Sequence, residues 1–408
     1  MPAKTTDLLG IRVLAVILAG GEGGRLDVLT EERAKPAIPF AGVYRLIDFV
    51  LSNCMHSKLH DVWLVQQYQA HSLSEHVANG RPWDLDRTHG GLRIVQPYLG
   101  RSESGWYKGN ADAIYRNKTE LARSGADLLL VLSADHVYKL DYREAIARHL
   151  ERDAEVTMVT TRVDPGEAGR FGVVRCDGEG RVLEFAYKPE EPAGDLVTTE
   201  VFVYDLPTLL ETLEELAEAS GADETGEDED GSGLQDFGHE LLPRLVERGR
   251  AYEHRLEGYW RDVGTVESYF DAHMELLAGD SALELGSPEW AIFTPSEQRP
   301  PAFIHASARL EESLVSPGCV VSGHVARSVL APGAVVEEGA SVRDAILLQD
   351  ALVETGARVE RAILDEGVRV ERGASVGEGA GEEITLVGRA ARIAAGTRVG
   401  RGERVQPG

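Results

Sequence analysis

The feature that most constrains the fold of this chain is an early apolar stretch that runs straight into a cluster of glycines. The apolar, β-prone residues Val13–Leu18 predict a buried parallel strand, because such strands are covered on both faces and carry continuous apolar runs. Gly20, Gly21 and Gly23 follow at the strand's carboxyl end, the edge at which open α/β sheets bind ligands. Glycine there lets backbone amides come close to a bound molecule, so a ligand-binding loop is predicted.

Two cations follow the glycines and indicate what such a loop could bind. Arg25 lies just after them, and Lys35 follows ten residues later, next to a proline. A polyphosphate needs this kind of local positive charge, although the stretch matches neither GxGxxG nor GxxxxGK[ST]. The alternative is a tight turn between strand and helix, with two surface charges.

A second hydrophobic strand, Asp127–Leu132, ends just before Asp135, which places a carboxylate at the same sheet edge. The alternative role for Asp135 is to cap the helix that is predicted near Asp141. Strands and helices alternate through the first part of the chain. Residues 73–91 are predicted to form an irregular polar segment, and one helix is predicted to run to Glu120. We therefore predict a Rossmann-like α/β domain over residues 1–280 and a proline-containing linker over 281–301.

From residue 302 onward the sequence has a period of six. Gly333 and Gly339 are six residues apart, and Val336 and Val342 keep the same step. One aliphatic anchor per six residues is typical of a hexapeptide-repeat parallel β-helix, in which stacked coils bury the aliphatic column. We predict such a domain over 302–408, although the frame slips between Leu348 and Val370.

Composition excludes several classes of partner. A net charge of −26 argues against nucleic acid and anionic membranes, since both need a basic surface. The chain has no apolar run of membrane-spanning length and no signal-peptide core, which predicts a soluble cytoplasmic protein. Its three cysteines are far apart and form no CxxC pair, as expected in a reducing compartment.

The motifs resemble a known family. The pattern GGxGxRL with Lys35–Pro36 about ten residues on is similar to the signature of sugar nucleotidyltransferases, and Tyr44–Cys54 is similar to the ADP-glucose pyrophosphorylase family of bacterial glycogen synthesis. Gly24 and Asn110 stand where that family usually has threonines. The resemblance implies a GT-A-like catalytic domain followed by a left-handed parallel β-helix. It also implies a homotetramer and a small-molecule allosteric effector at the junction of the domains.

The resemblance further implies a reaction and a set of roles. A glucose 1-phosphate oxygen attacks the α-phosphorus of ATP, and pyrophosphate leaves. Arg25 and Lys35 would hold the leaving phosphates, while Asp135 and Asp262 would bind Mg²⁺. The implied nucleotide-binding residues are Gly20, Gly21, Gly23, Gln96 and Gly109, and the implied sugar-phosphate residues are Tyr107, Gly172, Lys188, Thr198, Glu200 and Asp236.

The sugar side departs from the family pattern. Tyr187 replaces the glutamate of Glu-Lys-Pro, and Glu200 replaces the glycine of Ser-Met-Gly. Either Glu200 restores the lost hydrogen bond to the sugar from another direction, or the enzyme uses a different sugar or base, for example to make GDP-glucose. A non-catalytic regulatory paralogue is the other alternative. An acyltransferase β-helix is not favoured, because only His305 and His324 fall in the repeat region and no further acid/base residue is grouped around them. The acidic segment 221–233 is predicted to be a solvated loop.

Overall fold

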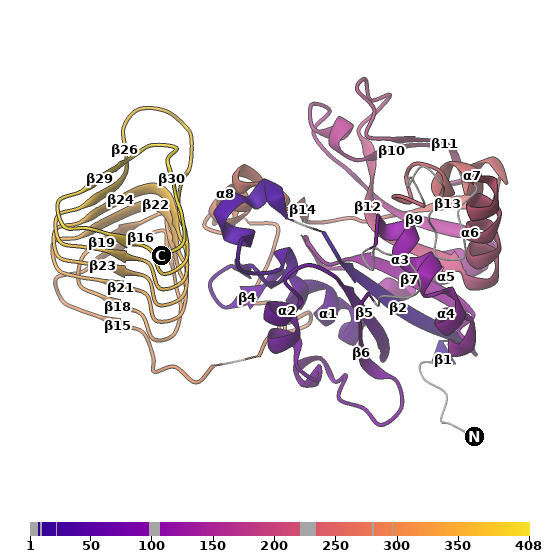
Figure 1. Cartoon of the computed structure of the whole chain (residues 1–408), viewed down its shortest axis with the longest axis horizontal. Coiled ribbons are helices and arrows are strands. Elements are labelled where there is room, and N and C mark those ends of the chain that lie inside the picture. The colour runs from indigo at the N-terminus through magenta and orange to yellow at the C-terminus, as the bar shows by residue number, and fades with distance from the viewer. Residues whose placement is uncertain are drawn as a thin grey trace.

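The computed structural model describes residues 7–8, 10–21, 23–97, 107–220, 234–279, 281–295 and 297–408. The acidic segment 221–233 lies outside them. Figure 1 shows two parts side by side, an α/β body built from the N-terminal two thirds of the chain and a stack of short strands built from the rest.

The α/β body is organised around a twisted mixed sheet. Its centre has the order β7-β2-β5-β6, with all neighbours parallel. On the other side of β7 lies β12, antiparallel to it, and β12 also pairs with β9 and β10. The strands are β1 (Asp7–Leu8), β2 (Ile11–Ala19), β5 (Asp61–Gln66), β6 (Gly91–Val95), β7 (Leu128–Ser133), β9 (Val156–Arg162), β10 (Gly172–Cys176), β11 (Val182–Tyr187), β12 (Leu196–Asp205) and β13 (Ala251–Arg255).

Helices cover both faces of this sheet, because the side chains of β2 alternate between two cores. Ala15 and Ile17 pack with α1 and α5 on one face, whereas Leu14 and Val16 pack with α3, α6 and α7 on the other. The helices are α1 (Leu46–His56), α2 (Ala70–Val77), α3 (Asn110–Arg116), α4 (Lys118–Ser124), α5 (Tyr142–Glu151), α6 (Leu206–Ser220), α7 (Leu241–Glu247) and α8 (Val266–Glu275). The predicted α/β architecture is confirmed.

Two local predictions were wrong. Residues 73–91 are not all irregular, since they contain most of α2 and the 3₁₀ turn η3 (Arg81–Trp83), whose Leu73, Val77 and Trp83 are buried. The helix predicted to run to Glu120 breaks at Asn117, where α3 ends and α4 begins. There the Asn117 side chain donates hydrogen bonds to Ala113 O at 2.8 Å and to the Tyr107 hydroxyl at 3.1 Å. These bonds hold the residue in a non-helical conformation.

A short ribbon that sequence patterns did not indicate is important for the site. β8 (His136–Tyr138) pairs antiparallel with β14 (Trp260–Asp262), which sets Asp262 opposite His136. Three residues are too few to show a strand period, so only the tertiary pairing defines these strands.

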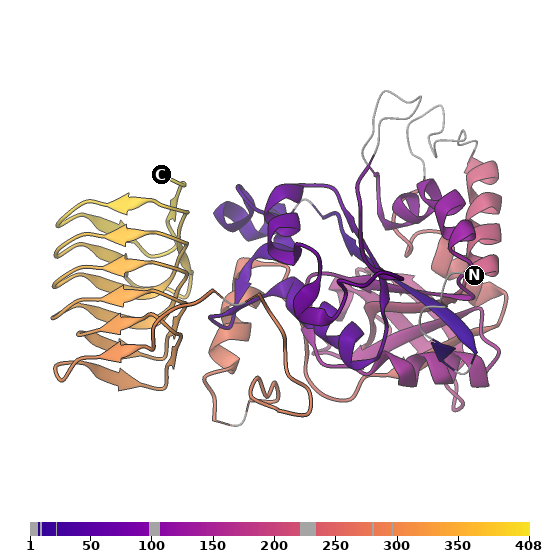
Figure 2. The same ribbon diagram turned by 90° about the horizontal axis from the view of Figure 1, so that it is seen from below.

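The C-terminal part is a parallel β-helix, as predicted, and its coils stack as parallel ladders in Figure 2. Val321, Val336, Val353 and Val370 lie in one fully buried column. Val335 pairs with the residue seventeen positions on, whereas Val320 pairs with one fifteen positions on, so the coils differ in length at their turns. This variation explains why the six-residue frame slips.

The strands of the β-helix are short. They are β15 (Phe303–Ile304), β16 (Arg309–Glu311), β17 (Leu314–Val315), β18 (Val320–Val321), β19 (His324–Ala326), β20 (Val329–Leu330), β21 (Val335–Val336), β22 (Ser341–Leu347), β23 (Leu352–Val353), β24 (Arg358–Leu364), β25 (Arg369–Val370), β26 (Ser375–Glu378), β27 (Thr385–Val387), β28 (Arg392–Ile393), β29 (Arg398–Gly400) and β30 (Arg404–Val405).

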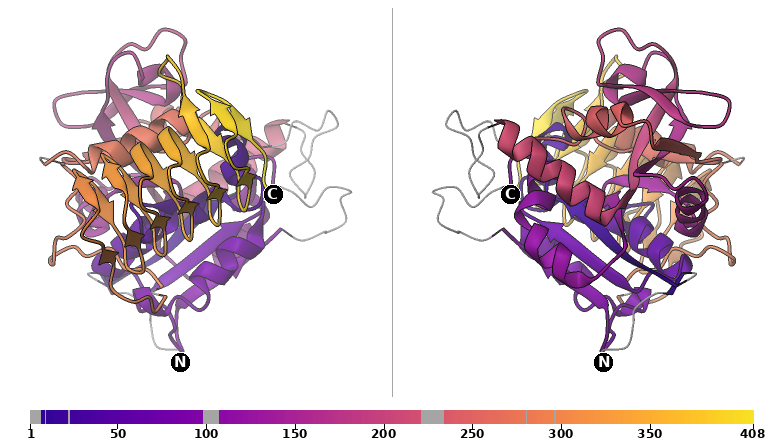
Figure 3. Two further views of the ribbon diagram at one scale, coloured as in Figure 1. Left: turned by 90° about the vertical axis from the view of Figure 1, so that its left-hand side faces the viewer. Right: turned by 90° about the vertical axis from the view of Figure 1, so that its right-hand side faces the viewer.

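The two parts share an apolar core. Phe40 and Phe270 of the α/β body pack in one cluster with Ile346, Ile363 and Leu386 of the β-helix. In Figure 1 helix α8 stands at the side of the body that faces the stack, and the left view of Figure 3 shows the stack lying across that side. The β-helix is therefore docked on the α/β body by buried apolar surface.

The segment between α8 and β15 is also packed. The Trp290 ring stacks on His56 with ring centroids 4.5 Å apart, and Phe293 N donates to Ser52 Oγ at 2.8 Å. Part of the predicted linker thus lies against α1. None of the helices in the described ranges combines the length and the apolar character needed to cross a membrane.

Candidate active site

A pocket of about 420 Å³ opens at the carboxyl ends of β2, β5 and β7. Gly20 and Gly21 follow β2, Gln67 follows β5, and Asp135 follows β7. Open α/β sheets bind ligands at this edge. The pocket is also lined by Arg25, Tyr107, Gly109, Tyr187, Lys188, Glu200 and Asp236, so it gathers most of the residues selected from the sequence.

The glycine loop has a defined shape. Gly23 has a φ of 76°, and a Cβ atom added to it would lie 2.9 Å from Thr30 Cγ2, so only glycine fits. Thr30 Oγ1 donates to the carbonyl oxygens of Gly23 and Asp27, each at 3.0 Å, which fixes the start of the 3₁₀ segment η1 (Gly24–Thr30). Arg25 lies in this segment, exposed in the pocket, and it has no hydrogen bond or ion pair with any described residue. Its guanidinium is available for an anionic ligand.

Lys35, Asp135 and Asp262 form a compact charged cluster. Lys35 begins the 3₁₀ turn η2 (Lys35–Ala37), and its side chain is nearly buried. Its ammonium donates a short hydrogen bond to Asp135 and lies 3.9 Å from Asp262 Oδ1. Burial disfavours both charges, but the ion pair outweighs it, so the pKa of Lys35 is raised and the pKa of Asp135 is lowered. Both groups are therefore charged at neutral pH.

His136 and Glu200 extend this cluster. One ligand atom each from Asp135, His136 and Glu200 lie within 4.8 Å of one another. His136 is buried, and its Nε2 lies 3.6 Å from Asp135 Oδ1 and 3.8 Å from Asp262 Oδ1. Glu200 is exposed in the open pocket, yet the protein atoms around it and the neighbouring Asp135 carboxylate raise the pKa of Glu200. Carboxylate and imidazole groups so arranged fit a divalent cation.

Three residues in the predicted sugar-phosphate region, Lys188, Tyr187 and Asp236, are connected by hydrogen bonds. The Tyr187 hydroxyl donates to Asp236 Oδ2 at 2.8 Å, and Lys188 Nζ donates to the Tyr187 oxygen at 2.8 Å. The Tyr187 ring lies so close to Gly238 that a Cβ atom there would be 2.1 Å from the ring. Burial and the Asp236 carboxylate raise the pKa of Tyr187, so the phenol stays protonated and keeps donating.

Two amide side chains, those of Gln67 and Asn110, also hold the pocket wall together. Gln67 Oε1 accepts from Tyr107 N at 2.5 Å, and Gln67 Nε2 donates to Tyr107 O at 3.1 Å. Asn110 Oδ1 accepts from Phe237 N at 2.6 Å, which ties the start of α3 to the loop that carries Asp236. An asparagine thus performs a structural task at the position where a threonine was expected.

Some selected residues lie elsewhere. Gly172 begins β10, and Thr198 is buried in β12, and neither is among the residues that line the pocket. Gln96 is exposed just past β6, next to residues outside the described ranges. Sequence reasoning missed Gln67 and His136 as site residues. The position of His136 directly after Asp135, at the end of a buried strand, was the available signal for it.

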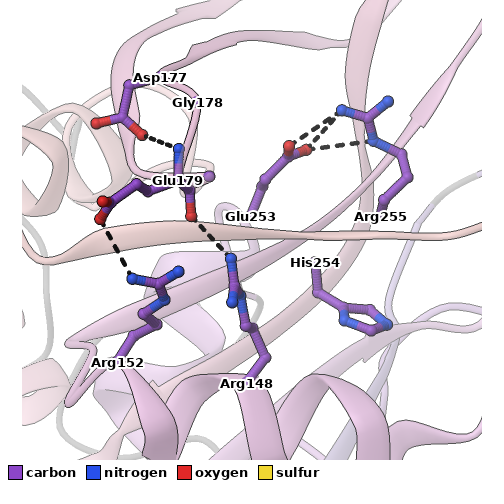
Figure 4. A pocket seen from close by; sticks show the side chains of 9 residues that line it. Arg148, Arg152, Asp177, Gly178, Glu179, Glu253, His254 and Arg255 are labelled. Carbon is purple, nitrogen blue, oxygen red and sulfur yellow. Dashed lines mark hydrogen bonds and ion pairs between the residues drawn. The ribbon is translucent and has the colours of Figure 1, made fainter.

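A second cavity, of about 560 Å³, is lined mainly by charged residues that are already paired, as Figure 4 shows. Arg148 donates to the carbonyl of Glu179 at 2.8 Å, and Arg152 lies 3.4 Å from the Glu179 carboxylate. Arg255 pairs with Glu253 at 2.9 Å. Because these charges neutralise one another, this cavity offers less to an anionic substrate than the pocket at the sheet edge.

Comparisons with known proteins agree with the geometry. A family model described as nucleotidyl transferase matches residues 14–279, and one described as GlmU-like, C-terminal hexapeptide matches residues 300–388. The glucose-1-phosphate adenylyltransferase of Thermotoga neapolitana is 43% identical over 333 residues, which are 81% of this chain and 76% of that protein. The enzyme of the same name from Thermomicrobium roseum is 47% identical over 310 residues, covering 76% and 70%. That of Bacillus thuringiensis is 39% identical over 338 residues, covering 83% and 87%.

Proposed function

Because this chain belongs to the glucose-1-phosphate adenylyltransferase family of nucleotidyl transferases, we propose that it converts ATP and α-D-glucose 1-phosphate into ADP-glucose and pyrophosphate. The product would supply α-glucan synthesis. The observation that carries the proposal is the cluster of Lys35, Asp135 and Asp262 beside Arg25 and the glycine loop, at the ligand edge of the sheet.

The proposed reaction is a single displacement. A phosphate oxygen of glucose 1-phosphate attacks the α-phosphorus of ATP, the bond from that phosphorus to the bridging oxygen breaks, and pyrophosphate leaves with the electron pair. Such transfers depend on positioning and on neutralising charge. We assign the leaving phosphates to Arg25 and Lys35 and the sugar phosphate to Lys188 and Asp236, which the Tyr187 hydroxyl joins.

Nucleotidyl transferases of this kind use a divalent metal, and the side chains present fit one. We propose Mg²⁺, with Asp135 and Asp262 as its protein ligands. When bound, the cation neutralises charge on the phosphate oxygens. Lys35 Nζ contacts both carboxylates, so the ammonium would have to move aside for a cation held by Asp135 and Asp262.

The remaining selected residues are assigned by position. Gly20, Gly21 and Gly109 would contact the nucleotide through their backbones, with Gly23 shaping the loop and Gln96 near the base. Tyr107 lines the pocket. Gly172 and Thr198 lie outside the pocket lining, so they would support the sugar-phosphate site without touching the ligand.

The test is a matrix of substrates. Purified protein with Mg²⁺ is offered each nucleoside triphosphate with each hexose 1-phosphate, and pyrophosphate release is followed. We expect ATP with α-D-glucose 1-phosphate to give the highest kcat/KM. A clear preference for GTP, or for mannose 1-phosphate, would contradict the proposed substrates. The protein would still be a sugar-phosphate nucleotidyltransferase.

We also propose a small anionic effector in the cleft between the two parts of the molecule. This cleft has a volume of about 930 Å³, and four arginines, Arg33, Arg45, Arg299 and Arg389, are among its lining residues. Burial and the nearby arginines lower the pKa of Arg45, and an anion would relieve this crowding. At its rim Glu32 lies 4.0 Å from Arg389 and weakens the positive field.

Initial rates with a panel of phosphorylated sugars and carboxylates test the effector. We expect Arg45→Ala to abolish any activation while basal activity persists. Activation that is unchanged in that variant would place the effector elsewhere.

Finally, we propose a homotetramer. Phe303, Ile304 and Leu310 in the first coil are exposed by 58%, 42% and 39%, and among the described strands β15 pairs only with β18. An open apolar edge of this kind is usually covered. Light scattering should give four times the chain mass, and Phe303→Ser with Leu310→Ser should reduce it. A monomeric wild-type protein would contradict the proposal.

A further inference from the structure

Glu200 stands in an unusual backbone position. β12 pairs with β9 as far as Thr198 and resumes only at Phe202, so the pairing is irregular around Glu200. Glu200 has a φ of 57°, a left-handed conformation that disfavours a residue with a side chain. The related family has glycine here, which would adopt this conformation without strain. This chain instead places a carboxylate in the pocket.

The same irregularity orients His136. The imidazole Nδ1 lies 3.0 Å from Thr199 O and donates to it, so Nε2 is the ring nitrogen that faces the carboxylates. Thr199 is fully buried, and its hydroxyl donates to Val159 O at 3.0 Å, so the carbonyl that holds the imidazole is itself fixed. Metal-binding histidines are commonly held in this way, by a hydrogen bond from the second ring nitrogen to a backbone carbonyl.

The Nε2 atom points into the carboxylate cluster. His136 is 4% exposed, and the distances of 3.6 Å to Asp135 and 3.8 Å to Asp262 are too long for hydrogen bonds. Nε2 makes only these long ion-pair contacts, and one ligand atom each of Asp135, His136 and Glu200 lie within 4.8 Å of one another, an arrangement that a bound cation would complete.

Charge leads to the same conclusion. Asp135, Asp262 and Glu200 bring three carboxylates together, and Lys35 is the buried cation among them. Arg170 contributes one contact to Asp262, at 3.2 Å, from a position about one third exposed. The three carboxylates outnumber these two cations, so the cluster keeps an excess negative charge that favours a further cation. Two carboxylates alone usually hold Mg²⁺ only together with substrate phosphates, whereas a third carboxylate and an imidazole add two protein ligands.

We propose that Glu200 and His136 join Asp135 and Asp262 to complete a cation site that binds Mn²⁺ in preference to Mg²⁺ and fills before the nucleotide arrives. This inference rests on the proposed function and deepens it at the same site. The preference follows from ligand chemistry, because Mg²⁺ is held mainly by oxygen ligands and waters, whereas Mn²⁺ is also bound by sites that combine carboxylates with an imidazole. Glu200 then serves the cation rather than a sugar hydroxyl.

Titration of metal-free protein with Mn²⁺, without nucleotide, tests the site through the electron paramagnetic resonance signal of free Mn²⁺. We expect one bound Mn²⁺ per chain. Glu200→Gly should weaken binding by at least roughly tenfold, as should Glu200→Gln. The glycine variant suits the backbone conformation, so loss of binding there cannot be attributed to misfolding. Glu257→Gln, at an exposed position outside the pocket, is the matched control and should bind normally.

Competition with Mg²⁺ tests the ring nitrogen. Mg²⁺ should displace Mn²⁺ only at much higher concentration, and His136→Gln should reduce that preference. Equal Mn²⁺ affinity in the wild type and in Glu200→Gly, or Mn²⁺ binding only after ATP is added, would overturn the inference.

The substrate matrix separates this failure from failure of the proposed function. Pyrophosphate release without nucleotide-independent Mn²⁺ binding would overturn the cation site alone. Mn²⁺ binding without pyrophosphate release from any substrate pair would overturn the proposed reaction alone.

Discussion

Arg33 Nη2 lies 2.6 Å from Asp365 Oδ1, with side chains exposed by only 3% and 1%. Arg33 lies in the loop between Arg25 and Lys35, and Asp365 directly follows strand β24 of the β-helix. This buried ion pair therefore ties the loop that carries both proposed phosphate-binding cations to the second domain. The contact gives the β-helix a direct mechanical connection to the active site.

Breaking this pair should destabilise the protein strongly. Asp365→Ala leaves the buried guanidinium with only the more distant carboxylate of Glu366, at 3.8 Å, and we expect it to lower the free energy of unfolding by about 3 kcal/mol. Urea denaturation followed by fluorescence measures the change. Arg392→Ala removes a pair whose arginine is 66% exposed and should cost less than about 1 kcal/mol. Equal effects of the two substitutions would show that the interdomain pair is not a major stabilising contact.

The cations of the phosphate loop should act on the triphosphate. Arg25 is free of hydrogen bonds to described residues and Lys35 is held by two carboxylates, and both stand where we place the leaving phosphates. We expect Arg25→Ala and Lys35→Ala to raise KM for ATP and to lower kcat, because charge develops on the leaving group. Steady-state kinetics with each substrate varied in turn measure this. Changes confined to KM for glucose 1-phosphate would reverse the assignment.

Asp262 should be essential for turnover and dispensable for folding. Its carboxylate lies near Lys35 and His136, at the end of a three-residue strand. We expect Asp262→Asn to lower kcat by several orders of magnitude, because the amide removes a cation ligand and keeps the shape. The Tm should change little, since asparagine has the same size. Asp195→Asn is the control and should turn over normally, because Asp195 directly precedes β12, pairs with Arg162 and lies outside the pocket. Near-normal kcat in Asp262→Asn would exclude it as a cation ligand.

Two buried histidines predict how stability depends on pH. His273 Nε2 accepts from Ala41 N at 3.0 Å and its Nδ1 donates to Tyr269 O at 2.8 Å, so the neutral ring satisfies both partners. Burial lowers the pKa of His273 to about 4, and burial likewise lowers the pKa of His149 to about 4. In the unfolded chain both would have pKa values near 6.5, so the unfolded state binds protons first as the pH falls.

Their contribution to stability is therefore complete above about pH 6.5 and is lost progressively as the pH falls toward 4. At pH 5 each histidine should reduce the free energy of unfolding by roughly 2 kcal/mol relative to pH 7. Urea denaturation at both values measures the loss, and His149→Gln should make it smaller. A stability that is the same at pH 7 and pH 5 would contradict this account.

Sequence patterns predicted the architecture because its signals are local. Val13–Leu18 and Asp127–Leu132 are continuous apolar runs, and the β-helix repeats an aliphatic anchor that ends up in a buried column. The patterns could not predict β8 and β14, since each has only three residues and exists only through pairing with the other. The proximity of Asp262 to Asp135 depends on that pairing.

The site was predictable where motifs follow strands and was unpredictable where partners are distant. Gly20, Arg25 and Asp135 lie at strand ends, and the structure places them in one pocket. The location of Glu200 beside His136 depends on an irregularity in β12 that has no composition signal. The bond between Tyr187 and Asp236 joins residues 49 positions apart, so only the folded chain reveals it.

Tyr187 should determine how well the sugar phosphate is held. Its hydroxyl bridges Asp236 and Lys188 at 2.8 Å on each side, in the position where the related family has a glutamate. Tyr187→Phe keeps the ring, which packs edge-on to His239 with centroids 4.8 Å apart, and removes only the bridging oxygen. Lys188 then loses the acceptor that orients it, and Asp236 loses a donor.

We expect this change to raise KM for glucose 1-phosphate roughly tenfold, which corresponds to the loss of about one net hydrogen bond. KM for ATP should stay within about twofold, because Arg25 and the glycine loop are untouched. Tyr252→Phe, on strand β13 and outside the pocket, is the matched control and should leave both values unchanged. If Tyr187→Phe instead raised KM for ATP alone, Tyr187 would belong to the nucleotide side, and the sugar phosphate would have to bind away from Lys188 and Asp236.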